Sequence, residues 1–466
     1  MSRTACAIAL LAILALPQSS NAQSLTPRQQ LARDIYQELI EINTVTATGD
    51  TLRAADAMAA RLRAGGFDAA DVQVLSPGPR KGNLVARLRG TGARKPILLL
   101  AHTDVVEARR EDWTTDPFKL VEKDGYFYAR GSLDQKFMAA TFVVNLIHYK
   151  QEGYRPDRDI ILALETDEEI LDADAKGIRW LLANHRALID AEFALNEGGG
   201  LGLKDGKPFR NSVQTAEKMS VQFQLEVTNK GGHSSVPSQD NAIYHLAEGL
   251  ARLGKFAFPV NLSTTTRQWF ERTADLETPE TAADIRAVLA GNPDPAALER
   301  LSANPPYNAQ LRTTCVATLL EGGHALNALP QTARASVNCR ILPGEKVEDV
   351  TAALTRVLAD DKILLTPIGQ PVLSAPSVVD EGLLAAIEKT AAEFWPGAPV
   401  VPVMSTGATD GSYLRNAGIP TFGHSGLAGD VDDNRSHGKD ERVAVKAFYE
   451  GGEYLYRLVK RLSGSK

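Results

Sequence analysis

Short apolar runs alternate with longer amphipathic stretches through the first half of the chain. The run 97–101 is continuously apolar and follows a proline, which predicts a buried, parallel strand. Similar short strands are predicted at 83–88, 159–165 and 193–196, and a helix is predicted at 137–150. Strands that alternate with helices in this way predict an α/β fold, a mostly parallel sheet flanked by helices on both faces.

The pattern changes near Glu217. Residues 219–228 alternate between apolar and polar positions, which predicts a half-exposed antiparallel strand. A charged helical stretch at 273–306 and a strand pair at 312–320 and 333–342 follow, before longer α/β elements return. We therefore expect an α/β domain formed by residues 23–215 and 366–466, with a smaller α+β domain, residues 216–365, inserted into it.

The first 22 residues have the pattern of a secretory signal peptide. Arg3 precedes the apolar run 5–16, and the small residues Ser20 and Ala22 precede a cleavage site before Gln23. The apolar run is too short for a stable membrane span. We expect the mature chain to be exported, periplasmic or secreted, without membrane attachment after cleavage; an uncleaved N-terminal anchor is the alternative.

Composition and charge narrow the classes of function. The chain has 466 residues, of which 44% are hydrophobic and 23% charged, as in soluble two-domain proteins. Its formal net charge of −6 gives no reason to expect a nucleic-acid partner. Removal of the signal would leave two cysteines, Cys315 and Cys339, each in a strand-like stretch; they could form a cross-strand disulfide or remain two buried thiols.

His102 and Asp104 stand at the end of the apolar strand 97–101. Residues two apart on an extended backbone point to the same side, and open α/β sheets bind ligands at the carboxyl ends of their strands. A metal-binding histidine usually donates its second N–H to a carboxylate, and Asp104 is placed to be that orienting partner. A histidine and an aspartate that merely cap a turn are the alternative at this point.

Further carboxylates and a histidine lie at comparable positions. Asp134 lies in a turn before a predicted helix, where alone it would be a helix cap, and Glu168 and Glu169 follow the strand 159–165. Crowded carboxylates at a strand end repel one another unless a cation neutralises them, although a solvated acidic loop is the alternative. Glu197 ends another strand, and His437 lies in a polar loop before the last helix.

Five of these residues form one candidate metal-ligand set: His102, Asp134, Glu169, Glu197 and His437. Nitrogen and oxygen ligands without a thiolate suit zinc, or another divalent ion such as cobalt or manganese. Two divalent ions carry four positive charges and would meet three carboxylates, which leaves one charge for a bridging hydroxide. We therefore expect two divalent metal ions, with zinc as the first choice.

The order of these motifs resembles the M20 family of metallopeptidases and deacylases, which includes acetylornithine deacetylase, succinyl-diaminopimelate desuccinylase, glutamate carboxypeptidase and carboxypeptidase S. The resemblance covers nearly the whole mature chain and rests on the segments 98–104, 131–136, 166–169, 196–199, 231–237 and 437–442. The segment 172–176 departs from it, because many relatives have a glycine soon after the paired glutamates. The resemblance implies a fold of the di-zinc exopeptidase type with an inserted lid and dimerisation domain.

The resemblance also implies a role for each residue of the set. Asp134 would bridge two metal ions, His102 and Glu197 would complete one site, and Glu169 and His437 the other. Glu168 would be the general base, and Asp104 would orient His102.

Three further positions match the family near the substrate, and a fourth shapes the pocket. His233, on the loop 231–235, would reach the active site of a partner subunit and stabilise the oxyanion, which implies a homodimer through the inserted domain. Asn327 and Arg340 would lie near the substrate, and Arg340 could hold a free carboxylate by a bidentate contact. Gly407 lies in a loop of small residues that would shape the same pocket.

These expectations describe an exported di-metal hydrolase of amide bonds next to a free carboxylate. A carboxypeptidase or dipeptidase acting on a small peptide is the first candidate, and an N-acyl-amino-acid deacylase is the second. A binding protein that kept the fold but lost catalysis is a third class. Loss of Glu168 or of a metal ligand would indicate such a protein, and the sequence retains all of them. A dinucleotide-binding enzyme is weaker still, because no G-x-G-x-x-G opens a helix after the first strand.

Overall fold

The computed structural model describes residues 24–170, 176–291, 293–369 and 372–464. The expected signal peptide, residues 1–22, lies outside these residues, as does nearly all of the departing segment 172–176. None of the helices in the described ranges is both long and apolar enough to cross a membrane.

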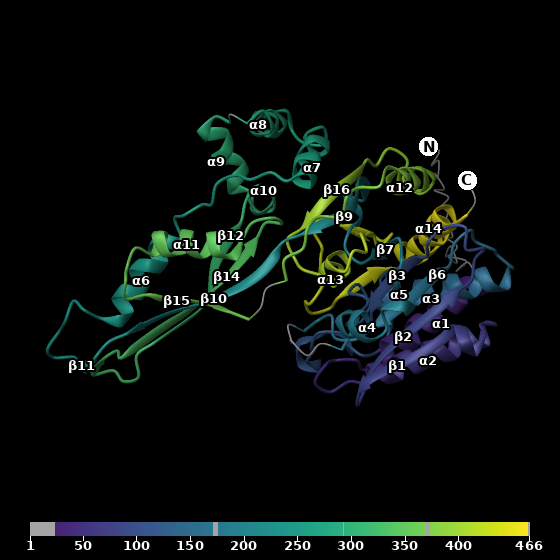
Figure 1. Ribbon diagram of the computed structural model, residues 1–466, viewed down its shortest axis with the longest axis horizontal. Coiled ribbons are helices and arrows are strands. Elements are labelled where there is room, and N and C mark those ends of the chain that lie inside the picture. Colours follow the sequence, from purple (N-terminus) through teal and green to yellow (C-terminus); the bar gives the residue numbers. More distant parts are fainter. Residues whose placement is uncertain (1–23, 171–175, 292, 370–371, 465–466) are drawn as a thin grey trace, which may run out of the picture.

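A ten-stranded sheet forms the larger part of the molecule (Figure 1). Its strands in spatial order are β1 (Val72–Gly78), β2 (Lys81–Leu88), β6 (Ile160–Glu165), β3 (Ile97–His102), β7 (Phe193–Asn196), β17 (Thr421–Gly423), β9 (Lys207–Glu217), β8 (Gly200–Lys204) and β18 (Ala428–Asp430), and β16 (Val400–Ser405) pairs with β9. β6, β3, β7 and β17 are parallel at its centre, so the predicted buried parallel strand at 97–101 is confirmed.

Helices cover both faces of this sheet. Leu99 packs into the larger core on one face, whereas Leu98 and Leu100 pack into a separate core on the other, so β3 has no polar side. The first face is covered by α1 (Pro27–Glu41), α2 (Thr51–Ala64), α3 (Lys136–Gln151), α12 (Glu381–Phe394) and α14 (Val445–Ser463). The second is covered by α4 (Ile178–Asn184), α5 (Arg186–Ile189) and α13 (Gly411–Asn416). The expected α/β architecture is confirmed.

A second, four-stranded antiparallel sheet continues from the first, because β9 leads directly into β10 (Figure 1). Its order is β12 (Thr314–Gly322), β14 (Thr332–Ile341), β10 (Met219–Thr228) and β15 (Leu364–Ile368). β10 alternates between buried and half-buried residues as its sequence predicts. The helices α6 (Ala242–Leu253) and α11 (Val347–Leu358) pack on the buried face, and the short strands β11 (Gly232–His233) and β13 (Ala328–Leu329) lie at the far end.

Cys315 and Cys339 lie directly opposite each other on β12 and β14 and form a disulfide bond. The predicted strand pair is therefore present and is antiparallel, and of the two alternatives for these cysteines the structure has the disulfide.

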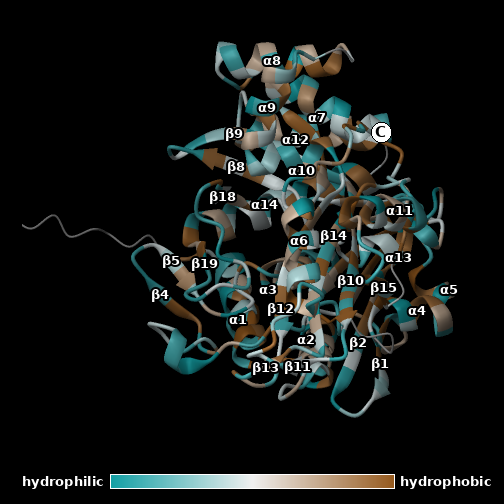
Figure 2. Ribbon diagram, turned by 90° about the vertical axis from the view of Figure 1, so that its left-hand side faces the viewer, coloured by the Kyte–Doolittle hydropathy of each residue, from teal (hydrophilic) through white to brown (hydrophobic). Residues whose placement is uncertain are grey.

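Four helices at one end of the molecule pack around Trp269 and Phe270 and against Val401 of β16 (Figure 1). They are α7 (Thr264–Ala274), α8 (Pro279–Leu289), α9 (Pro295–Ala303) and α10 (Pro305–Leu311). The helical stretch expected at 273–306 is thus present, but its first helix begins earlier, where Ser263 caps it. Figure 2 shows hydrophilic and hydrophobic residues alternating along surface helices such as α8, as expected of helices that bury one side.

A small three-stranded sheet joins the C-terminal part of the chain to the region before α3. Its order is β19 (Arg442–Ala444), β5 (Tyr126–Tyr128) and β4 (Val121–Lys123). The pairing of β19 with β5 brings Glu441 beside the turn that carries Asp134.

Candidate active site

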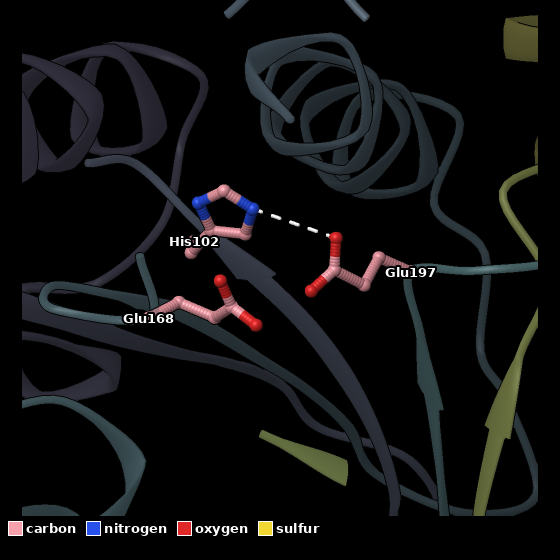
Figure 3. A group of neighbouring side chains, drawn as sticks. All are labelled: His102, Glu168 and Glu197. Atoms are coloured by element: carbon pink, nitrogen blue, oxygen red, sulfur yellow. Dashed lines mark ion pairs between the residues drawn. The ribbon is translucent and has the colours of Figure 1, made fainter. Parts of the chain in front are cut away.

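The carboxyl ends of three neighbouring strands bring the predicted residues together. His102 ends β3, Glu168 and Glu169 follow β6, and Glu197 follows β7. Figure 3 shows Glu168 and Glu197 extending their carboxylates toward the His102 ring from different sides. His102 Nε2 lies 3.5 Å from Glu197 Oε2. The strand order thus explains why residues 95 positions apart share one site.

Asp134 lies between the two histidines. Its Oδ1 is 3.3 Å from His102 Nε2, and its Oδ2 is 3.3 Å from His437 Nε2. His437 Nε2 is also 3.0 Å from Glu169 Oε2. The two carboxylate oxygens of Asp134 therefore face two separate groups of ligand atoms, His102 with Glu197 and His437 with Glu169.

Asp104 contacts the ring of His102 and also two backbone N–H groups. His102 Nδ1 lies 3.0 Å from the backbone carbonyl oxygen of Asp104 and 3.7 Å from its carboxylate Oδ1. The carboxylate instead accepts hydrogen bonds from the backbone N–H groups of Glu168, at 3.2 Å, and Glu169, at 3.0 Å. The expectation that the Asp104 carboxylate itself orients the ring therefore needs correction, because the backbone carbonyl is the nearer acceptor and leaves Nε2 free to bind.

A buried ion pair that the sequence analysis did not identify supports both Asp134 and His437. Arg130 Nη1 lies 2.6 Å from Glu441 Oε2, and both side chains are buried. Glu441 Oε1 accepts the backbone N–H of Leu133 at 2.7 Å and of Asp134 at 3.0 Å. Arg130 Nη2 donates to the carbonyl oxygen of His437 at 3.2 Å. One ion pair thus holds the Asp134 turn against the His437 loop.

The crowding of charges shifts the pKa values of the cluster. Burial alone would lower the pKa of His102, but the carboxylates of Glu197 and Asp134 outweigh it and hold that pKa well above its usual range. Hydrogen bonds to Asp134 and Glu169 raise the pKa of His437 to about 10. Burial, and then the charge of Glu197, hold the pKa of Glu168 well above its usual range.

The same cluster fits divalent cations. His102 Nε2 is buried without a hydrogen-bond partner in the described structure, although carboxylate oxygens surround it. Ligand atoms of His102, Asp134 and Glu169 lie within 4.8 Å of one another, as do those of His102, Glu168 and Glu197. Divalent metal ions bind to such groups of histidine nitrogen and carboxylate oxygen atoms, and their positive charge would offset the negative charge of the carboxylates.

The other predicted site residues lie outside this cluster. His233 is exposed on β11, and the carbonyl of Asn327 accepts a hydrogen bond from Ser234 at 3.0 Å, so both lie at the far end of the smaller sheet (Figure 1). Arg340 is on β14, opposite Ser220 of β10 and near the junction of the two sheets. Gly407 is exposed in the loop after β16. The roles assigned to these four residues stay predictions.

Comparison with known proteins identifies relatives whose similarity spans all the residues of the candidate site. The model of the peptidase family M20/M25/M40 matches residues 98–461. The chain is 30% identical to the N-fatty-acyl-amino acid synthase/hydrolase PM20D1 of Homo sapiens over 78% of this chain and 74% of that protein. It is 28% identical to the probable carboxypeptidase S-like 2 of Dictyostelium discoideum over 78% of this chain and 71% of that protein.

Solved structures share the fold at lower identity. The M20 family metallo-carboxypeptidase Sso-CP2 of Sulfolobus solfataricus has a TM-score of 0.66 at 18% identity, over 92% of this chain and 98% of that one. The YXEP protein of Bacillus subtilis, described as a dinuclear metal-binding peptidase of the M20 family, has a TM-score of 0.59 at 13% identity, over 94% of this chain and 98% of that one.

Proposed function

The chain belongs to the peptidase family M20/M25/M40 and is a hydrolytic enzyme, and from this premise we propose that it hydrolyses the amide bond of N-acyl amino acids with two divalent metal ions. The observation that carries the proposal is the position of Asp134 between His102 and His437, with Glu168 beside them. The named activity of PM20D1 supports the N-acyl amino acid as substrate.

Five residues would hold the two ions. Asp134 would contribute one oxygen to each, His102 and Glu197 would complete one site, and Glu169 and His437 the other. Zinc suits these donors, and cobalt or manganese could replace it. Bound there, the ions would lower the pKa of water and polarise the scissile carbonyl.

Glu168 would be the general base. Its raised pKa without metal reflects burial among other carboxylates, and its backbone N–H is fixed by Asp104. The Glu168 carboxylate accepts a proton from the attacking water and passes it to the nitrogen of the leaving amino acid. Proton transfer of this kind contributes roughly 10²–10⁴ in rate.

The free carboxylate of the amino acid would bind to Arg340, with Asn327 and Gly407 beside it. Arg340 Nε donates to Asn338 Oδ1 at 3.2 Å, which fixes the plane of the guanidinium near the junction of the two sheets. A planar guanidinium suits a carboxylate because it can donate two parallel hydrogen bonds.

A carboxypeptidase or dipeptidase is the second candidate, although sequence reasoning placed it first. The carboxypeptidase S-like relative supports it. Both reactions cleave an amide bond next to a free carboxylate and would use the same residues. The relative of higher identity acts on N-acyl amino acids by name, which reverses the order of the two candidates.

We also infer export and a homodimer. The Cys315–Cys339 disulfide supports an oxidising compartment, where such bonds persist. The edge strand β12 exposes Val316, Leu319 and Leu320, and an exposed apolar edge is a common site of strand pairing between subunits. The dimer would place His233 of one subunit at the active site of the other.

The test is hydrolysis of N-acetyl-phenylalanine and of the dipeptide Ala-Phe by metal-free protein and by protein with zinc, cobalt or manganese restored. We expect no activity after chelation and recovery with added metal, with the N-acyl substrate preferred. Full activity in protein that elemental analysis finds free of metal would refute the metal assignment. Preference for the dipeptide would select the second candidate.

A further inference from the structure

A glutamine outside the proposed ligand set contacts one of its carboxylates. Gln135 directly follows Asp134 in the sequence, and its side chain is buried. Its Nε2 donates a hydrogen bond to Glu197 Oε2 at 3.1 Å. The same Glu197 oxygen lies 3.5 Å from His102 Nε2, and Asp134 Oδ1 lies 3.3 Å from that nitrogen. Gln135 therefore reaches the place where the three proposed ligands of one metal ion meet.

The chemistry of its partner fixes the orientation of this amide. An ionised carboxylate only accepts hydrogen bonds, so the Gln135 amide must present its N–H group to Glu197. The opposite orientation would place two oxygen atoms against each other. The contact therefore requires a donor, and neither an apolar side chain nor a second ionised carboxylate could make it.

The backbone around Gln135 is held in place as well. Its carbonyl oxygen accepts the N–H of Met138 at 3.1 Å, in the first turn of α3, a helix that is buried along most of its length. The N–H of the preceding residue, Asp134, is bound by Glu441 at 3.0 Å. The amide thus extends from the fixed start of a buried helix to the ligand that follows β7.

The two proposed metal sites differ in this support. Glu169 is held through its backbone N–H, which donates to Asp104 at 3.0 Å. Glu197 is held by Gln135 through the carboxylate itself. A contact to the carboxylate restricts the direction in which its oxygens point, whereas a contact to the backbone leaves that direction to the side-chain rotamer. Loss of the Gln135 amide should therefore affect the site of Glu197 more than the site of Glu169.

We propose that Gln135 is a positioning residue for the metal site of His102, where its amide holds the Glu197 carboxylate toward the ion; the inference rests on the proposed function. Gln135 is not itself a ligand in this assignment, and its whole contribution passes through Glu197. Groups that orient metal ligands contribute about 10–100-fold to metal affinity.

Gln135→Met tests the proposal, because methionine is similar in size but has no N–H group to donate. In competition with a chelator, we expect one of the two zinc equivalents to bind about 10–100-fold more weakly and the other to change less. Wild-type affinity for both equivalents would overturn the inference and leave the proposed function intact. A wild-type protein that binds zinc at neither site would instead refute the proposed function. Gln135→Asn, whose shorter amide withdraws from Glu197, replaces the variant if Gln135→Met does not fold, with the same expected result.

A double-mutant cycle tests whether the effect passes through Glu197. Glu197→Ala lowers zinc affinity by itself, because it removes a proposed ligand. In that background, Gln135→Met should change the remaining affinity by less than about twofold, since the carboxylate that it would hold is gone. A further loss as large as in the wild-type background would show that Gln135 acts on the fold and not on Glu197, and would overturn the inference.

Gln310 on α10 offers a matched control. It is also buried, its Nε2 donates to the backbone carbonyl oxygen of Met404 at 2.8 Å, and its Oε1, like that of Gln135, has no hydrogen-bond partner in the described structure. Gln310→Met therefore removes a comparable buried amide that contacts no metal ligand, and zinc affinity should stay unchanged. Urea unfolding of the metal-free variants is expected to give similar midpoints for both. A lower midpoint for Gln135→Met with unchanged zinc affinity would assign this glutamine a structural role only.

Discussion

At the scale of single residues, Asp104 makes hydrogen bonds to three residues of the candidate active site. Its carboxylate accepts the backbone N–H of Glu168 and of Glu169, and its carbonyl oxygen accepts Nδ1 of His102. One buried aspartate therefore fixes the proposed base, one proposed ligand of each metal ion, and the tautomer that leaves Nε2 of His102 available.

Glu168→Gln tests the base. Glutamine keeps the shape of the side chain and cannot take a proton, so we expect kcat to fall by roughly 10²–10⁴. Both metal ions should remain, as measured by elemental analysis, because Glu168 is not one of the five proposed ligands. Asp167→Asn is the matched control, since Asp167 is the preceding carboxylate and pairs with Lys81 outside the cluster. Loss of a metal ion from Glu168→Gln, or a normal kcat, would show that its role is wrongly assigned.

Glu441→Gln tests the ion pair that holds the ligand loops. The variant removes the counter-charge of buried Arg130 and weakens the acceptor of the Asp134 N–H. Groups that orient metal ligands are typically worth 10–100-fold in metal affinity, so we expect zinc to bind that much more weakly, with kcat largely restored at saturating zinc. Competition with a chelator measures the affinity.

Glu393→Gln is the control for this substitution, because Glu393 pairs with Arg461 and Arg457 at the surface, where such pairs contribute little. Equal zinc affinity in both variants and the wild type would mean that the Arg130–Glu441 pair does not position the ligands.

At the scale of elements, the sequence predicted those strands and helices whose pattern is set by local burial. β3, β6, β7 and β10 were all predicted, because continuous apolar runs or strict alternation mark them. β8 and β9 were not predicted, since β8 contains two glycines in five residues and pairs on one side with β18, which is distant in sequence.

In the candidate site, too, the sequence predicted what a local pattern marks and missed a contact between distant segments. The five proposed ligands stand in recognisable motifs at strand ends, whereas the Arg130–Glu441 pair joins residues 311 positions apart. Arg130 lies next to the motif 131–136 and Glu441 lies within the motif 437–442, but nothing local indicates that they meet. The pairing of β19 with β5 brings them together, and that register is a property of the folded molecule.

The disulfide gives a prediction at this same scale. Cys315 and Cys339 are 24 residues apart, and closing a loop of that length restricts the unfolded chain by about 3 kcal/mol. We expect the Cys315→Ala/Cys339→Ala double variant to unfold at lower denaturant concentration than the oxidised wild type, and reduction to bring the wild type to the same midpoint. Coincident unfolding curves before and after reduction would contradict a disulfide in the native protein.

At the scale of the whole molecule, the candidate active site lies on the large sheet, while His233 lies at the far end of the small one (Figure 1). The loop around it is shaped by Gly231, whose φ of +71° other residues rarely adopt. Ser235 Oγ lies 2.7 Å from His233 Nδ1, and His233 itself is exposed. A histidine placed there has no contact with its own metal ligands, so it can serve catalysis only at a site that is brought to it.

Mixing two inactive variants tests whether that site belongs to a second subunit. His233→Ala should fold, bind two metal ions and lower kcat by roughly 10²–10³, with little change in KM, because an oxyanion donor acts only in the transition state. Glu168→Gln lacks the base but keeps His233. In a hybrid dimer one active site receives Glu168 from one subunit and His233 from the other, so the mixture should regain part of the wild-type activity. If subunit exchange is demonstrated by mass spectrometry and the mixture stays inactive, His233 acts within its own subunit or has no catalytic role.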